Sequence, residues 1–225
     1  MARNTPDGST FHTTALAYAG SLVCLATAET VVGDLDQLDS VAAIATGASR
    51  LVAMGLIHLV GGFLLAVALV GVAQLVRGSV LGGIGWWILA FTVPCVGAFA
   101  MLHLLAVETA AEGLDAAAMN EFLTERLGQG AGAWAVPVGV FALLAPVAHV
   151  LLTVALARRG VIAWAAPVLV LLGMVGHAVI GSGTSEIASL WVLAAGAVVA
   201  GYGMWRYRGT TPLPARSQSA EAVQA

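Results

Sequence analysis

The stretch from Leu51 to Val76 constrains the fold most, because it contains no charged residue and only one histidine, His58. As an α-helix it would be roughly 39 Å long at about 1.5 Å per residue. That length is enough for a tilted crossing of a hydrocarbon layer about 30 Å thick. An ordinary surface helix of a soluble protein is not this apolar along so great a length. The sequence therefore predicts a membrane-spanning helix here.

Composition extends this prediction to the rest of the chain. Only 9% of the 225 residues are charged and 60% are hydrophobic, with a mean hydropathy of +0.94. A soluble domain carries about 25% charged residues, so this chain could not cover a water-exposed surface. The net charge of −3 and the absence of a basic block exclude a nucleic-acid-binding protein. We therefore predict an all-α, polytopic membrane protein whose partner is the lipid bilayer.

The apolar runs predict a bundle of six transmembrane helices in one domain, residues 13–207. The predicted spans cover roughly residues 13–32, 51–76, 83–109, 134–156, 161–181 and 186–205. The polar segments 1–12 and 208–225 are expected to be disordered cytoplasmic tails. Residues 33–49 are expected to form an acidic loop with a short helical turn. Residues 112–129, between the third and fourth spans, are expected to form a short amphipathic helix on the outer membrane surface.

The first span has an alternative interpretation as a signal peptide. The sequence Ala26-Thr27-Ala28 resembles a cleavage site that follows a short apolar core. The apolar run continues through Thr30, Val31 and Val32, however, so we predict a retained helix.

The arginines predict the orientation. With six spans, most of them fall on one side of the membrane: Arg3, Arg77, Arg158, Arg159, Arg206 and Arg208. The acidic residues of segments 33–49 and 112–129 fall on the other side, with Arg50 and Arg126 as exceptions. An excess of arginine marks the cytoplasmic side. We therefore predict a multi-pass protein of the plasma membrane with both termini in the cytoplasm.

Ionisable residues inside spans are costly and indicate function by default. Four successive predicted spans each carry one histidine: His58, His103, His149 and His177. Counted along the helices, His58, His103 and His177 fall in the outer half of the membrane, and so does Glu29. His149 falls alone in the inner half. A neutral histidine can instead simply form a hydrogen bond to a neighbouring helix. We favour this structural role for His149, with Thr153 on the same helix face.

The surroundings of two histidines suggest a cofactor. Glycines flank them on the same helix faces: Gly55, Gly61 and Gly62 near His58, and Gly173 and Gly181 near His177. Such a flat groove can hold either a partner helix or a planar cofactor such as haem b. Methionine near histidine also suits copper, and imidazole suits zinc. The predicted cofactor ligands are His58, His103 and His177, with Glu29 as an additional metal ligand.

Three function classes stay open at this stage. The sequence contains no nucleotide-binding P-loop, no zinc-protease motif and no serine-hydrolase motif, and no catalytic residue is predicted. The first class is a redox or metal protein with haem, copper or zinc near the outer face. The second is a small transporter or permease whose histidines relay protons or bind substrate. The third is a structural or regulatory membrane subunit without a cofactor.

Two family resemblances follow from this layout. Histidines in the second to fifth of six helices resemble the ascorbate-reducible two-haem b-type cytochromes, which implies that His58 pairs with His149 and His103 with His177. The depths of His58 and His149 counted above do not match such a pairing. Residues 13–207, with Ser49-Arg50-Leu51 and LLTVALARRGVIAWAAPVLVLLG, also resemble a widespread bacterial family of six-helix membrane proteins of unknown function. That family implies no activity.

Overall fold

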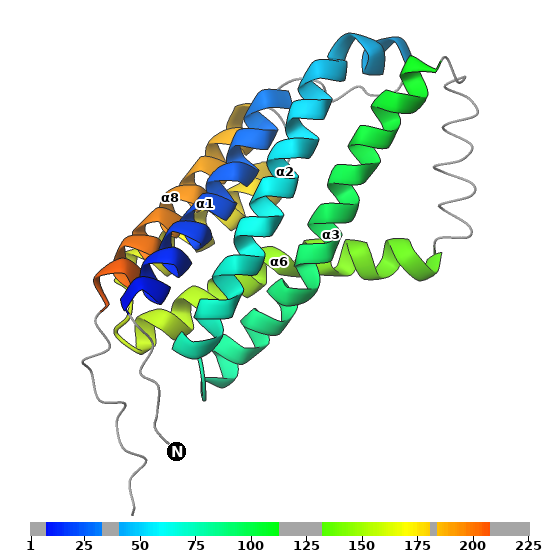
Figure 1. Cartoon of the computed structure of the whole chain (residues 1–225). Helices are drawn as coiled ribbons and strands as arrows, with labels where there is room; N and C mark the ends of the chain where they lie inside the picture. Colours follow the sequence, from blue (N-terminus) through cyan, green and yellow to red (C-terminus); the bar gives the residue numbers. More distant parts are fainter. Residues whose placement is uncertain (1–7, 33–40, 113–131, 181–183, 208–225) are drawn as a thin grey trace, which may run out of the picture.

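The computed structural model describes residues 8–32, 41–112, 132–180 and 184–207. Within these ranges the protein consists of six helices and has no strand, which confirms the all-α prediction (Figure 1). The helices are α1 (Gly8–Val32), α2 (Val41–Leu75), α3 (Val80–Ala111), α6 (Gly132–Arg158), α7 (Ala165–Ile180) and α8 (Thr184–Arg206).

Four of these helices are long and apolar enough to cross a membrane. Their apolar segments are Phe11–Val31, Thr46–Leu75, Val80–Ala98 and Thr184–Arg206. The other two helices contribute shorter apolar segments, Leu144–Arg158 and Ala165–His177. The predicted membrane environment is therefore supported by the described residues of α1, α2, α3 and α8.

Several predicted boundaries are wrong. Helix α1 begins at Gly8 instead of after residue 12, because Phe11 is buried and contacts Tyr207 edge to face. Helix α2 begins at Val41, inside the predicted loop 33–49, where an alanine-rich sequence favours helix. Residues 161–164 connect two helices instead of starting a span. The predicted surface helix at 112–129 lies outside the described residues except for Glu112.

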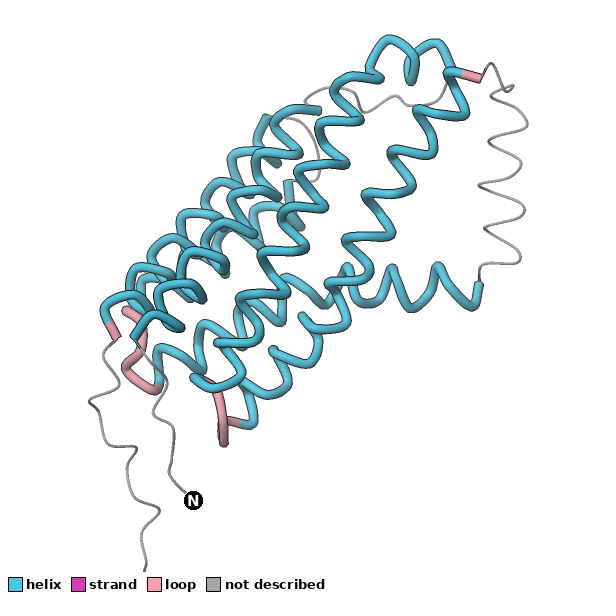
Figure 2. Tube along the Cα trace, in the orientation of Figure 1, coloured by secondary structure: helices cyan, strands magenta, loops and turns pink. Residues whose placement is uncertain are grey.

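The helices contact one another in a closed ring. Each helix packs against the next one along the chain, and α8 packs against α1. Figure 1 shows α1 between α8 and α2, while α6 lies obliquely across the other helices. The α2–α3 and α6–α7 connections lie at the end of the bundle where α1 begins and α8 ends (Figure 2). The ring therefore has one end at which α1 begins and α8 ends, called below the end of the termini, and an opposite end.

Small residues bring neighbouring helices of this ring close together. A Cβ atom added at Gly196 would lie 2.8 Å from a side-chain carbon of Val170 in α7. A Cβ added at Gly201 would lie 2.8 Å from the carbonyl oxygen of Ala15 in α1. Small residues thus allow close packing on both sides of α8.

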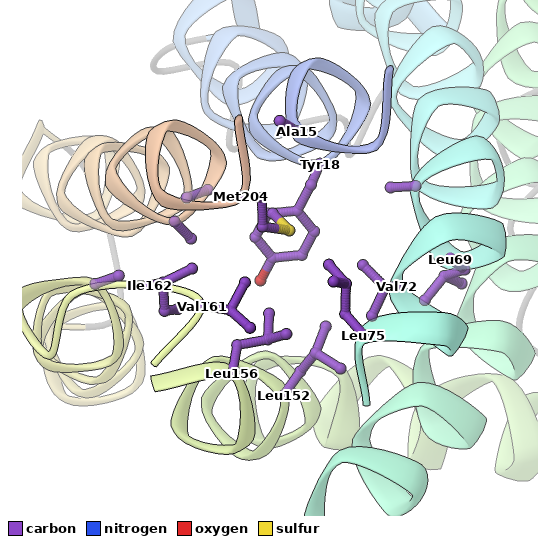
Figure 3. Close-up of a cluster of buried hydrophobic side chains, with 14 of the residues drawn as sticks. Ala15, Tyr18, Leu69, Val72, Leu75, Leu152, Leu156, Val161, Ile162 and Met204 are labelled. Atoms are coloured by element: carbon purple, nitrogen blue, oxygen red, sulfur yellow. The ribbon is translucent and has the colours of Figure 1, made fainter. Parts of the chain in front are cut away.

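The main hydrophobic core fills the end of the bundle that holds the termini. Its residues come from the segments of each helix nearest that end, including the start of α1, the ends of α2 and α6, and the end of α8. The ring of Tyr18 lies among Met204, Val161 and Leu156 (Figure 3) and is completely buried. The opposite half of the bundle contains the candidate site.

Candidate functional site

A cavity of about 380 Å³ lies inside the ring and is lined by side chains from all six described helices. Its polar lining consists of Ser21, Glu29, His58, Thr92, Cys95, His149, His177 and Glu186. Its apolar lining includes Leu22, Leu25, Leu65, Val96, Met174, Leu190 and Leu193. A mostly apolar cavity with a few converging polar groups is typical of small-molecule sites.

Exposure differs between the two ends of this cavity. His149 retains 5% of its accessible surface and lies next to the hydrophobic core. The side chains of Glu29, His177 and Glu186 are 34%, 40% and 33% exposed. These three residues lie near the end of α1, the end of α7 and the start of α8. The cavity therefore opens at the end of the bundle opposite the termini and is closed by the core at the other end.

Glu29 and His58 form a pair between α1 and α2 at this opening. Oε1 of Glu29 lies 3.7 Å from Nε2 of His58, which is within the range of an ion pair but longer than a hydrogen bond. The two helices approach closely because Gly61 faces Cys24 and the carbonyl oxygen of Ser21. Glu29 thus lies at the mouth of the cavity and beside His58, which the sequence predicts to be a ligand.

His177 and Glu186 form a second pair, between α7 and α8. Nδ1 of His177 lies 3.2 Å from Oε1 of Glu186, although the atoms are not aligned as a hydrogen bond. Sequence reasoning missed Glu186, which resembles an ordinary acidic residue in the first turn of a helix. The available signal was the short connection between α7 and α8, which brings the last turn of one helix beside the first turn of the next.

His149 and Tyr18 form a third pair at the closed end. The Tyr18 hydroxyl and Nδ1 of His149 are 3.1 Å apart, and both residues are buried. The hydroxyl of Thr153 donates to the carbonyl oxygen of His149 at 2.8 Å. The predicted hydrogen-bonding role of His149 is confirmed, but its partner Tyr18 was missed. His149 lies toward the closed end, as predicted for the inner half, but it is not isolated there, because it lines the same cavity as His58 and His177.

The predicted ligand set is only partly described. Glu29, His58 and His177 line one cavity. His103 belongs to α3, but its side chain lies outside the described part of the structure. Within the described part, no group of three or more histidine, cysteine, aspartate or glutamate side chains is close enough to hold a metal ion. The metal and haem ligands therefore stay a prediction.

The glycine grooves hold neighbouring helices. Gly62 faces Val96 of α3, and Gly55 faces the carbonyl oxygen of Ala100 and the side chain of Leu104. Gly173 packs directly against the backbone of Leu193 in α8. The sequence allows either a partner helix or a planar cofactor in these grooves. At Gly55, Gly62 and Gly173 the structure places a partner helix.

Comparison of the chain with known protein families, curated proteins and solved structures finds no match. The two family resemblances drawn from the sequence therefore stay predictions, and the function has to be inferred from the cavity itself.

Proposed function

We propose that the protein is a small transporter-like protein of the plasma membrane whose cavity binds a small molecule from the outer side. The observation that carries this proposal is a cavity to which all six described helices contribute lining residues. Its volume of about 380 Å³ is near the lower end of known ligand pockets. Helices that rock against one another around such a central site can change the access of the ligand.

The proposal includes six spans with both termini in the cytoplasm. The arginines at the closed end, among them Arg77 and Arg159, favour this orientation. The guanidinium of Arg159 also donates to the carbonyl oxygen of Arg77 at 2.8 Å, so the two connections are held together. Helix α7 has only 16 residues, which extend about 24 Å. A bilayer accommodates such a short span by local thinning.

The native cysteine in the cavity gives a direct test. After Cys24→Ser, Cys95 is the only cysteine of the chain. We expect a small, membrane-impermeant thiosulfonate added outside intact cells to label Cys95, because Cys95 lines the cavity and the proposed orientation opens the cavity to that side. Ala145→Trp, which fills the cavity, should slow labelling, whereas Val140→Trp on the exposed face of the same helix should not.

The orientation is checked in the same cells. With both native cysteines replaced by serine, Ser79→Cys in the α2–α3 connection should be labelled only after the membrane is permeabilised. Labelling of Ser79→Cys from outside would contradict the proposed orientation. An unreactive Cys95 in a correctly oriented protein would contradict an outward-open cavity and would favour a structural or regulatory subunit.

A metal or haem site is the second candidate, because Glu29, His58 and His177 line the same cavity. We expect such a protein to be purified with near-stoichiometric copper or zinc, or with a Soret band, through ligands that include His103. His58→Ala or His177→Ala should abolish the metal or the band. His12→Ala should retain it, since His12 stacks on Trp205 at the other end of the bundle. A spectrum and metal content unchanged by the first two substitutions would exclude this candidate.

A further inference from the structure

We infer that the ligand of this cavity is a small amphiphilic amine in its protonated form, whose N–H groups donate to Glu29 and Glu186 at the mouth. This inference rests on the proposed function, because it requires that the cavity binds a small molecule. It adds the chemical class of that molecule, which follows from the charge, the polarity and the residue types of the lining.

Charge gives the first part of the inference. The cavity lining carries two carboxylates, Glu29 and Glu186, and no arginine from the described residues. The sequence contains no lysine at all. The two carboxylates come from α1 and α8, which pack side by side, at the same end of the ring. A carboxylate near low-dielectric surroundings attracts a cation far more strongly than one in water. An anionic ligand would meet two like charges at the mouth.

The histidine partners leave room for a ligand. A neutral imidazole donates at most one N–H to a carboxylate, whereas the two carboxylate oxygens offer about four acceptor sites. The longer of the two pairs, at 3.7 Å between Glu29 and His58, is not a hydrogen bond in length. A glutamate that already has a histidine beside it can therefore still accept a hydrogen bond from an ammonium group at the mouth. Deeper in the cavity, Nδ1 of His149 is already paired with the Tyr18 hydroxyl.

The rest of the lining indicates what the ammonium group is attached to. Leucines at positions 22, 25, 65, 190 and 193 line the cavity together with Val96. Their apolar surface suits a compact hydrocarbon body of a size that fits about 380 Å³. A hydrated inorganic ion would leave this surface unused. An amphiphilic organic cation uses both parts of the cavity.

The type of ammonium group follows from what the lining lacks. None of the described residues that line the cavity is a phenylalanine, tyrosine or tryptophan. Proteins recognise quaternary ammonium groups, which have no N–H, chiefly with the faces of aromatic rings. Carboxylates and imidazoles instead accept charge-assisted hydrogen bonds from N–H donors. The lining therefore favours a primary, secondary or tertiary amine over a quaternary one.

The test uses the full-length protein in lipid nanodiscs and four probes that share one hydrocarbon cage. The probes are 1-adamantanamine, 1-adamantanol, 1-adamantanecarboxylate and the N,N,N-trimethyl derivative of the amine. Calorimetric titration, corrected with empty nanodiscs for partitioning into lipid, gives each affinity. We expect the protonated amine to bind at least roughly tenfold more tightly than the other three, because only it donates N–H groups to the glutamates.

Substitutions connect this preference to the two glutamates. Glu29→Gln with Glu186→Gln should weaken amine binding roughly tenfold or more, because both charge-assisted hydrogen bonds are lost. Glu108→Gln removes the same charge from an exposed position on α3 outside the cavity and should leave the affinity unchanged. Protection of Cys95 from labelling in the Cys24→Ser protein shows whether each probe enters the cavity.

The outcomes separate the inference from the proposed function. If the alcohol protects Cys95 and binds as tightly as the amine, the cavity is a ligand site but the inferred class is wrong. Equal amine binding by the double glutamine variant also overturns the inference. Failure of the amine to bind also overturns the inferred ligand class. The proposed function is tested separately, by the reactivity of Cys95 with the reagent added outside.

Discussion

Replacing Gly173 by alanine is expected to separate α7 from α8 and to destabilise the protein by about 1–3 kcal/mol or more. The added Cβ would lie 2.5 Å from the backbone nitrogen of Leu193 and 2.7 Å from its Cα. These are backbone atoms, so no rotation of a side chain can relieve the overlap. The two helices must move apart, and they then lose contacts along their whole length. Because this pair carries His177 and Glu186, the mouth of the cavity should change shape as well.

A glycine without neighbours provides the matched control. Gly97 of α3 has no atom within 4 Å of the position where a Cβ would be added. Gly97→Ala should leave stability unchanged or raise it slightly, because alanine favours helix. Thermal unfolding of both variants in the same detergent, followed by size-exclusion chromatography with fluorescence detection, measures the difference. A Gly173→Ala protein as stable as the wild type would contradict the close α7–α8 contact.

Replacing Tyr18 by alanine should cost about 3–5 kcal/mol, the range found when a large buried aromatic side chain is removed. Tyr18 has no accessible surface and lies at the centre of the core in Figure 3. Its ring fills space between α1, α6 and α8, so alanine would leave a cavity there. Increasing fractions of sodium dodecyl sulfate in mixed micelles, monitored by circular dichroism, measure the loss of helix.

Tyr18→Phe separates packing from hydrogen bonding at this position. The phenylalanine keeps the ring but leaves Nδ1 of the buried His149 without the hydroxyl, at a cost of about 1–3 kcal/mol. Tyr202→Ala is the control for loss of a tyrosine ring, because Tyr202 is 62% exposed on the outer face of α8. It should change stability by less than about 0.5 kcal/mol. If the Tyr18→Phe protein is as stable as the wild type, the hydroxyl contributes nothing to stability.

The sequence predicts where the helices of this protein lie along the chain better than it predicts which residues of different helices contact one another. The stretch from Leu51 to Val76 forms most of α2, because length and hydrophobicity are local properties that determine a membrane helix. His58 and His177 could also be selected from the sequence as candidates, since an ionisable group in an apolar run is visible without a structure. Both line the cavity together with Glu29.

The parts of the site that were missed depend on packing between helices. Nothing in the first span distinguishes Tyr18 from an aromatic residue that faces lipid, and only the ring of helices brings it to His149. Glu186 resembles a residue that stabilises a helix start, and the connection after α7 brings it to His177. His149 lies toward the closed end, as its predicted depth in the inner half implies, but counting along one helix does not show that it lines the same cavity as His58.

The closed ring also means that the order of the helices is cyclic. The first and last helices pack together, and near the chain ends Phe11 contacts Tyr207 while His12 stacks on Trp205. The α6–α7 connection lies at the same end of the bundle as both termini (Figure 2). A circular permutant with joined tails and new termini at this connection would therefore keep the direction of every helix. Of the contacts between successive helices in the ring, that between α6 and α7 is the least extensive, so this is where the backbone can be cut with the smallest loss.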